Sequence, residues 1–150
     1  MSSKTTAQVI TDLAKEAYEA SREKGWYAET DAIRAVRKAG QRITGLGDLF
    51  TKFIDRHTVN DVPVFTKLSL VHTEVSEAIQ LLRGLAPGGP RITTDVIEND
   101  KLVGLPSELA DIIIRTLELA AALDIDIGEA IRRKMVWNSS RSFRHGDKRC

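Results

Sequence analysis

The sequence contains a long stretch, KLSLVHTEVSEAIQLL (residues 67–82), in which apolar residues recur every three or four positions. This spacing predicts an amphipathic helix. Glu74 and Glu77, three positions apart, then project from neighbouring points of that helix. Two like charges so close repel each other. A single pair of this kind is typical of a solvated acidic edge, so its meaning depends on whether the pattern recurs.

The pattern recurs in PSELADIIIRTLELAAALDI (residues 106–125), where Glu108 and Asp111 are again three positions apart. This segment is still more apolar, and charges in such a helix need partners. Two helices joined by a loop tend to pack antiparallel, which would bring both acidic pairs to one place. Carboxylates that meet there need a cation to neutralise them. Oxygen ligands alone suit a hard ion, Mg²⁺ or Mn²⁺, of the kind that serves phosphate chemistry.

The rest of the chain also favours helices, so the predicted fold class is all-α. We expect a single domain, with an N-terminal helical extension over residues 1–60 and catalytic helices over 63–145. Glycine and proline punctuate the pattern around 87–104, which predicts a small hairpin turning at 98–100 or a loop insertion. The remaining boundaries that we expect are a first helix ending near Gly25, a second running from a cap at Thr30 or Asp31 to Gly40, a short helix within 45–57, one from Pro63 to Gly84, and a last one capped by Asp126 and Glu129.

Composition excludes several classes of protein. The 150 residues carry a net charge of only +1, which argues against a partner that is a nucleic acid polymer. A lone cysteine, Cys150, excludes a disulfide framework and a cysteine-built zinc site. The N-terminus lacks the pattern of a signal peptide, and no apolar run reaches the roughly 20 residues needed to cross a bilayer. We therefore expect a cytoplasmic protein without a membrane partner.

Basic residues gather at the C-terminal end. Residues 132–149 hold seven Lys or Arg against one acidic residue. Four side chains, at steps of four, three and four, share one face if the helix continues that far: Lys134, Asn138, Arg141 and His145. Arginine binds phosphate oxygens through two bonds, and lysine acts as a point charge. This stripe predicts phosphate binding, although a solvated basic tail is the usual meaning of such a run.

Several other residues receive a structural interpretation. Trp26 and Tyr27 follow a helix end, where aromatic residues more often pack than bind a base. Trp137 points away from Asn138 and is assigned to the core or to an interface. Arg115, four positions after Asp111, is expected to pair with that carboxylate and orient it.

Three motifs in the sequence are EVSE, ELAD and KMVWNSSRSFRHGDK. They resemble the motifs of the MazG-like, all-α nucleoside triphosphate pyrophosphohydrolases. The resemblance covers just over half of the chain and leaves the first 60 residues unplaced. It implies that Mg²⁺ is bound by Glu74, Glu77, Glu108 and Asp111. It also implies that the nucleotide is contacted by Lys134, Asn138 and Arg141, and we expect His145 and Lys148 to close over it. A homodimer or dimer of dimers, with active sites near subunit interfaces, is implied as well.

The leading hypothesis is therefore a Mg²⁺-dependent enzyme that hydrolyses a (deoxy)nucleoside triphosphate to monophosphate and pyrophosphate, as nucleotide-pool housekeeping. One carboxylate, with Glu77 as the first choice, would take the proton of the attacking water. Two alternatives stay open at this point. One is the phosphoribosyl-ATP pyrophosphohydrolase of histidine synthesis, and the other is a non-catalytic helical interaction module whose acidic pairs are surface edges.

Overall fold

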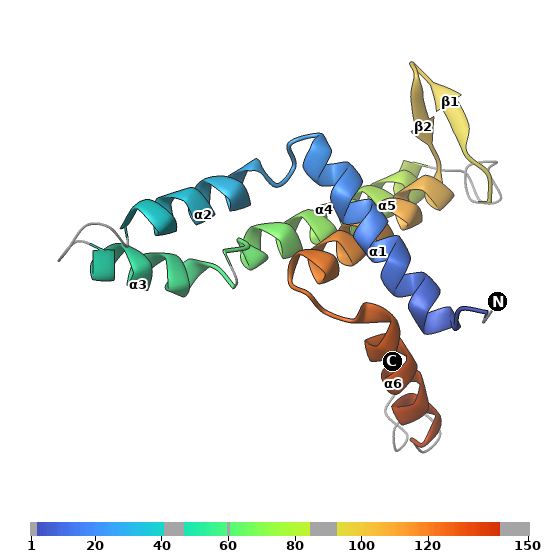
Figure 1. Cartoon of the computed structure of the whole chain (residues 1–150). Helices are drawn as coiled ribbons and strands as arrows, with labels where there is room; N and C mark the ends of the chain where they lie inside the picture. Colours follow the sequence, from blue (N-terminus) through green and yellow to red (C-terminus); the bar gives the residue numbers. More distant parts are fainter. Residues whose placement is uncertain (1–2, 41–46, 60, 85–92, 142–150) are drawn as a thin grey trace.

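A computed structural model of the chain describes residues 3–40, 47–59, 61–84 and 93–141. Within these residues it consists of helices and one small β-hairpin, which confirms the all-α class and the hairpin insertion (Figure 1). The elements, in chain order, are α1 (Thr6–Glu23), α2 (Ala28–Gly40), α3 (Gly47–His57), α4 (Val64–Gly84), β1 (Val96–Glu98), β2 (Lys101–Val103), α5 (Leu105–Ala122) and α6 (Ile127–Ser139). Among the described helices, none combines the length and the apolar content needed to cross a membrane.

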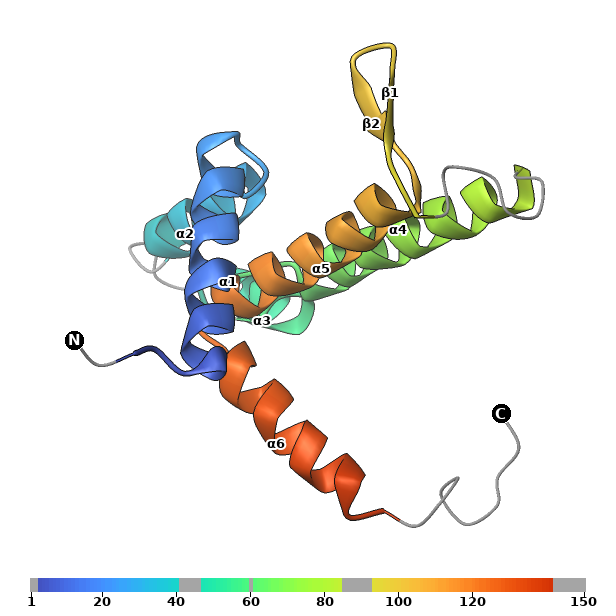
Figure 2. The ribbon, with the colours of Figure 1, turned by 90° about the vertical axis from the view of Figure 1, so that its right-hand side faces the viewer.

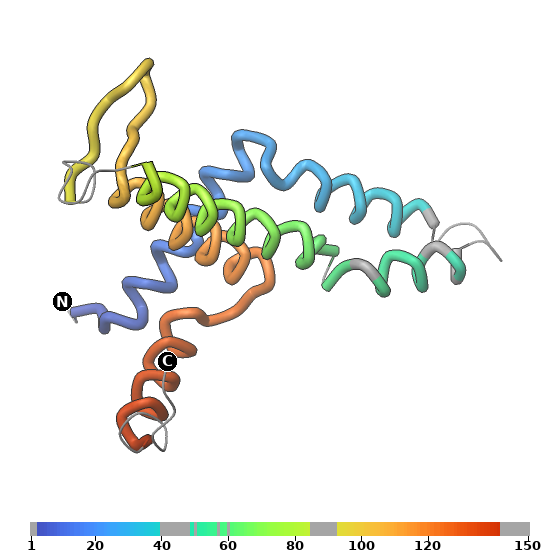
Figure 3. The backbone as a smooth tube through the Cα atoms, turned by 180° about the vertical axis from the view of Figure 1, so that it is seen from behind, coloured from blue at the N-terminus to red at the C-terminus, as the bar shows by residue number. Residues whose placement is uncertain are grey.

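The helices are arranged around an antiparallel pair, α4 and α5, which lie side by side along most of their length. Helix α1 crosses α5, and α6 leaves the end of α5 to pack against α1 (Figure 2). Helices α2 and α3 pack against each other and extend from one end of the pair, whereas the hairpin stands at the other end (Figure 3). The loop between α4 and α5 thus gives the antiparallel packing expected from the sequence.

The buried core sits where the turn between α1 and α2 meets α4 and α5. Tyr27, Val62, Leu119 and Ala122 form it, and the ring of Tyr18 meets that of Tyr27 edge-on at 4.7 Å. This confirms the packing role expected for Tyr27. Aromatic rings bury a large area and make a large contribution to the stability of a core. The N-terminal turn is therefore anchored to the same two helices that carry the acidic pairs.

Most helix boundaries follow the sequence signals, with one exception. The expected cap of α2 at Thr30 or Asp31 is wrong, because α2 begins at Ala28 and Thr30 is fully buried inside its first turn. The chain reverses before α2 at Gly25, whose φ of 82° is a conformation that glycine adopts without strain. The prediction failed because tertiary burial of Tyr27 and Thr30, rather than side-chain capping, fixes this helix start.

The ends of α5 and α6 have clear local causes. Pro106 lies in the first turn of α5, and the Asp95 carboxylate accepts a hydrogen bond from the Ser107 amide at 3.0 Å. The Asp126 carboxylate caps α6 by accepting from the amide of Glu129 at 3.0 Å, as expected. The Glu129 side chain instead pairs with Arg132, so only one half of the predicted capping box is observed.

The hairpin turns where the sequence indicated. Val96 pairs with Val103 and Glu98 with Lys101, which leaves Asn99 and Asp100 as the two-residue loop. Both loop residues have positive φ, at 51° and 61°, as a tight hairpin turn requires. Residues 85–92, the first part of the expected insertion, lie outside the described residues.

Candidate metal centre

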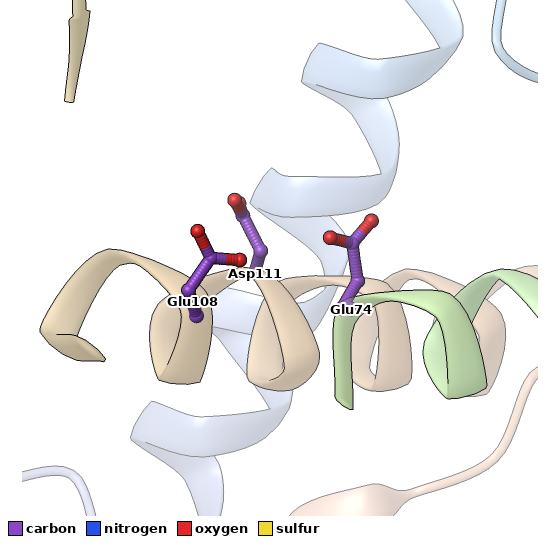
Figure 4. Close-up of side chains that lie close together, drawn as sticks. All are labelled: Glu74, Glu108 and Asp111. Carbon is purple, nitrogen blue, oxygen red and sulfur yellow. The ribbon is translucent and has the colours of Figure 1, made fainter. Parts of the chain in front are cut away.

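Three carboxylates meet between the two central helices. Glu74 comes from α4, and Glu108 and Asp111 come from neighbouring turns of α5 (Figure 4). One oxygen from each lies within 4.8 Å of the others. The three-residue spacing places the two α5 side chains on one side of their helix, and antiparallel packing sets Glu74 against them. The expectation that both helices direct their acidic residues to one place is thus confirmed for these three.

The fourth expected ligand, Glu77, lies at the edge of this group. It sits almost one turn after Glu74 on α4 and is exposed to solvent. It does not belong to the set whose oxygens lie within 4.8 Å. Its charge nevertheless reaches Glu108 and raises the pKa of that carboxyl. Glu77 therefore adds negative charge to the surroundings of Glu108 without belonging to the group of three.

The electrostatics of the group disfavour three bare negative charges. Burial is the main cause that raises the pKa of Glu108, and the charges of Glu77, Asp111, Glu74 and Asp95 raise it further. The pKa of Asp111 is also raised, first by burial and then by Glu74. Within the described part of the chain, no ion pair joins Glu108 or Asp111 to a cationic side chain. The site would gain stability from a bound cation.

Asp95 adds a further negative charge near the group of carboxylates, and this was not predicted from the sequence. It lies before β1 and caps α5 through Ser107, which brings its charge near Glu108. Because Asp95 is separated from the acidic pairs along the chain, their spacing gave no sign that it lies near Glu108. The sequence did offer one signal of this contact. An acidic residue precedes a predicted hairpin, and the hairpin leads directly into the start of a helix.

Arg115 contacts a different carboxylate from the one expected. Its Nε donates to Oε1 of Glu74 at 3.2 Å, across the helix pair, and Nη1 lies 3.9 Å from Glu118. The predicted pair with Asp111 is not formed, although the charge of Arg115 does lower the pKa of Asp111. The side chain reaches Glu74 because α4 is packed beside α5.

The basic residues of the C-terminal end are placed elsewhere. Lys134 and Asn138 are exposed on α6, which packs against α1 and points away from the α4–α5 pair (Figure 2). Because α6 ends at Ser139, Arg141 follows the helix instead of extending its face. A single chain therefore does not bring these side chains to the carboxylates. His145 and Lys148 lie outside the described residues.

Trp137 is 63% exposed, so its assignment to the core is wrong and its assignment to an interface stays a prediction.

The donor set fits a hard divalent cation. Three carboxylates from two rigid helices supply only oxygen atoms, which Mg²⁺ and Mn²⁺ prefer over nitrogen or sulfur sites. Mg²⁺ sites in proteins use few carboxylates and leave room for substrate phosphates. The group at α4 and α5 matches this requirement, since Glu108 is only partly buried and Asp111 is exposed.

Comparison with known proteins gives one relevant similarity. The chain is 45% identical over 42 residues to a "dATP/dGTP diphosphohydrolase" of Cyanophage S-2L, a match covering 28% of this chain and 40% of that protein. The shared segment is short. No family model matches the chain, and no solved structure matches it significantly. The MazG-like resemblance therefore stays an expectation drawn from the motifs.

Proposed function

We propose that the chain hydrolyses a (deoxy)nucleoside triphosphate to the monophosphate and pyrophosphate, in a reaction that depends on Mg²⁺ or Mn²⁺. The observation that supports this most is the convergence of Glu74, Glu108 and Asp111, whose oxygens lie within 4.8 Å of one another. The similarity to a dATP/dGTP diphosphohydrolase agrees with a triphosphate substrate and favours purine deoxynucleotides. Nucleotide-pool housekeeping is the role that such an activity would serve.

The three carboxylates would hold the cation, and Glu77 would act beside it. A Mg²⁺ ion bound there would polarise phosphate oxygens and offset the charge that develops on them. Glu77 is exposed and lies near Glu108 without joining the group of three, so it has room to contact a water molecule. A carboxylate in that position can accept a proton from water during attack.

The chemical step would proceed at the α-phosphorus. The water oxygen attacks this atom while Glu77 takes one proton of the water. The bond between the α-phosphorus and its bridging oxygen then breaks, and that oxygen leaves with the pyrophosphate. Positive side chains would hold the departing phosphates, and Lys134, Asn138 and Arg141 are the candidates from the sequence.

Because α6 points away from the carboxylates of its own chain, we propose that a second copy completes the site. Helix α4 supports such an assembly with an apolar stripe on its exposed side. Its members follow one another at steps of three, seven, four and three residues: Phe65, Leu68, Val75, Ile79 and Leu82. His72 divides the step of seven residues into four and three, and it is the polar member of the stripe. The neighbouring face of α4, with Ala78 buried, packs on α5. Apolar residues at this repeat are typical of helices that pair with another helix.

The decisive experiment is a nucleotide panel with product analysis. The purified chain is incubated with each deoxynucleoside triphosphate, with the ribonucleotides and with phosphoribosyl-ATP, in Mg²⁺ and in EDTA. We expect release of pyrophosphate and monophosphate from at least one deoxynucleotide, and only with metal. Preference for phosphoribosyl-ATP would favour the histidine-pathway alternative. Lack of turnover with every compound would contradict an enzyme and favour the interaction module.

A matched pair of variants tests the site itself. Glu108→Ala should abolish most turnover because it removes a central ligand, whereas Glu129→Ala, which removes a carboxylate that pairs with Arg132 on α6, should not. Equal activity in both variants would show that the carboxylate group is not the catalytic centre.

A further inference from the structure

Arg115 is held from three directions beside the candidate centre. Its Nε bonds to Glu74 at 3.2 Å, and its guanidinium carbon lies 4.6 Å from the centre of the Trp26 ring. Glu118, 3.9 Å from its Nη1, is buried and also accepts a hydrogen bond from the Ser21 hydroxyl. A guanidinium with this many partners keeps one orientation, because each contact restricts a different part of the planar group.

Trp26 is itself fixed in position, although its side chain is 51% exposed. It lies between Gly25, where the chain reverses, and Tyr27, which is buried in the core. The carbonyl oxygen of Trp26 accepts a hydrogen bond from Nζ of Lys67, on α4, at 2.6 Å. The turn between α1 and α2 is therefore tied to the same helix that carries Glu74.

These contacts form a chain from the N-terminal turn to the metal candidate. We propose that Arg115 is a positioning residue that holds Glu74 ready to bind a divalent cation, and that Trp26 keeps Arg115 in place. The inference rests on the metal site of the proposed function. It gives the first 60 residues, for which the motifs indicate no role, a part in building that site.

The contact leaves Glu74 able to bind a metal. Arg115 bonds to Oε1, and a carboxylate can bind a cation through its other oxygen. Partners that orient the ligands of a metal site typically change metal affinity by about 10- to 100-fold when they are removed. Arg115 also has an opposing effect, because its positive charge repels a cation nearby. The two effects have opposite signs, so a measurement of metal affinity separates them.

The test is direct binding of Mn²⁺ to the full chain without nucleotide, followed by electron paramagnetic resonance of the free ion. If Arg115 positions Glu74, we expect Arg115→Ala to raise the Kd for Mn²⁺ by about 10-fold. Arg115→Lys keeps the charge and loses the planar contact, so its Kd should fall between those of wild type and Arg115→Ala. A lower Kd for Arg115→Ala would show that Arg115 acts mainly as a repelling charge, and an unchanged Kd would show that its contact with Glu74 gives no net gain in binding; either result would overturn the proposal.

Trp26→Leu tests the second half of the proposal and keeps both ion pairs of Arg115. It should raise the Kd in the same direction as Arg115→Ala. The double variant Arg115→Ala/Trp26→Leu should be no weaker than Arg115→Ala alone, because Trp26 acts through Arg115. Additive losses would show that Trp26 does not act through Arg115, and would overturn that part. If Arg115→Ala does not fold, Arg115→Lys and Trp26→Leu still decide the question.

Two controls complete the design. Arg37 is 24% exposed and bonds to Asp55 and Asp61 in the α2–α3 region, so Arg37→Ala removes a cation as buried as Arg115, which is 23% exposed. Arg37→Ala should destabilise the fold without changing the Kd for Mn²⁺. Glu74→Ala should abolish tight binding. Normal binding of Mn²⁺ by Glu74→Ala would contradict the metal site of the proposed function. If Glu74→Ala loses binding but the Arg115 and Trp26 variants bind Mn²⁺ normally, only the positioning role is contradicted.

Discussion

The pKa of Glu108 is raised by several negative charges around the candidate centre. Burial raises its pKa above the usual 4.5, and four neighbouring carboxylates add to the shift. The folded state therefore binds a proton at Glu108 more tightly than the unfolded chain does. Its contribution to the free energy of unfolding is consequently largest at low pH and is lost as pH rises through the interval above 4.5. Asp111 contributes with the same sign.

Glu108→Gln should therefore stabilise the metal-free protein near pH 7. The substitution keeps the size of the side chain and removes one charge, so relief of repulsion of roughly 0.5 kcal/mol would raise the Tm by about 1–2 °C. Thermal unfolding in EDTA, followed by circular dichroism from pH 5 to pH 8, measures this. The Tm should also depend less on pH in the variant, and added Mg²⁺ should stabilise wild type but not Glu108→Gln. A lower Tm for the variant in EDTA would contradict the assignment.

At this scale the sequence indicated the three carboxylates that come together and missed their surroundings. Equal spacing in two apolar helices is a local signal, so Glu74, Glu108 and Asp111 could be predicted. The contacts of Arg115 with Glu74 and Trp26, and of Asp95 with α5, join elements far apart in the chain. No local pattern records such contacts, because they depend on how the helices pack.

Among the elements, α6 is tied to α1 at its first turn, and its residues from 130 to 139 are exposed. The Thr11 hydroxyl donates to Asp126 at 2.7 Å and accepts from the Gly128 amide at 3.1 Å, which ties the first turn of α6 to α1. A Cβ at Gly128 would lie 1.9 Å from the carbonyl oxygen of Ala7. The sequence predicted the cap at Asp126 but not this close approach of two backbones, because a glycine inside a helix has several possible causes.

Gly128→Ala should therefore loosen the contact between α1 and α6. The added methyl group meets backbone atoms that cannot move independently, and overpacking of this kind costs roughly 1–3 kcal/mol. Urea unfolding should show a lower midpoint at an unchanged slope.

Gly84→Ala is the matched control, because its added Cβ meets no atom within 4 Å among the described residues beyond its chain neighbours and its own helix backbone. It should be neutral or slightly stabilising. Equal unfolding midpoints for the two variants would mean that the approach of α6 to α1 is not tight.

For the whole molecule, the sequence predicted the helices and their class better than their arrangement. Apolar spacing and glycine breaks mark each helix locally, but they do not say which face of α4 its neighbours cover. Helix α5 packs along one face of α4, and the exposed stripe leaves Leu68 and Ile79 in solvent. The direction of α6 could not be predicted either, since it depends on the contact with α1.

The exposed stripe of α4 predicts self-association. Light scattering should give at least twice the 16.6 kDa mass of one chain at micromolar concentration. Ile79→Glu should shift the mass to that of a single chain, because a charge within an apolar helix interface is costly to bury. Val9→Glu is the control, since Val9 is also exposed but lies on α1. A monomer mass for wild type at every concentration would contradict the assembly.

If a second copy completes the site, two inactive variants should restore each other. Glu108→Ala removes a carboxylate, and Lys134→Ala/Arg141→Ala removes the expected phosphate contacts. A site shared between subunits gives every mixed dimer one site with both sets intact. A statistical mixture, in which about half of the dimers are mixed, should then recover about one quarter of wild-type activity. Carboxylates and basic residues acting within one chain would leave the mixture no more active than the average of its parents. Steady-state turnover after refolding the two variants together therefore decides whether α6 serves the centre of its own chain or that of its partner.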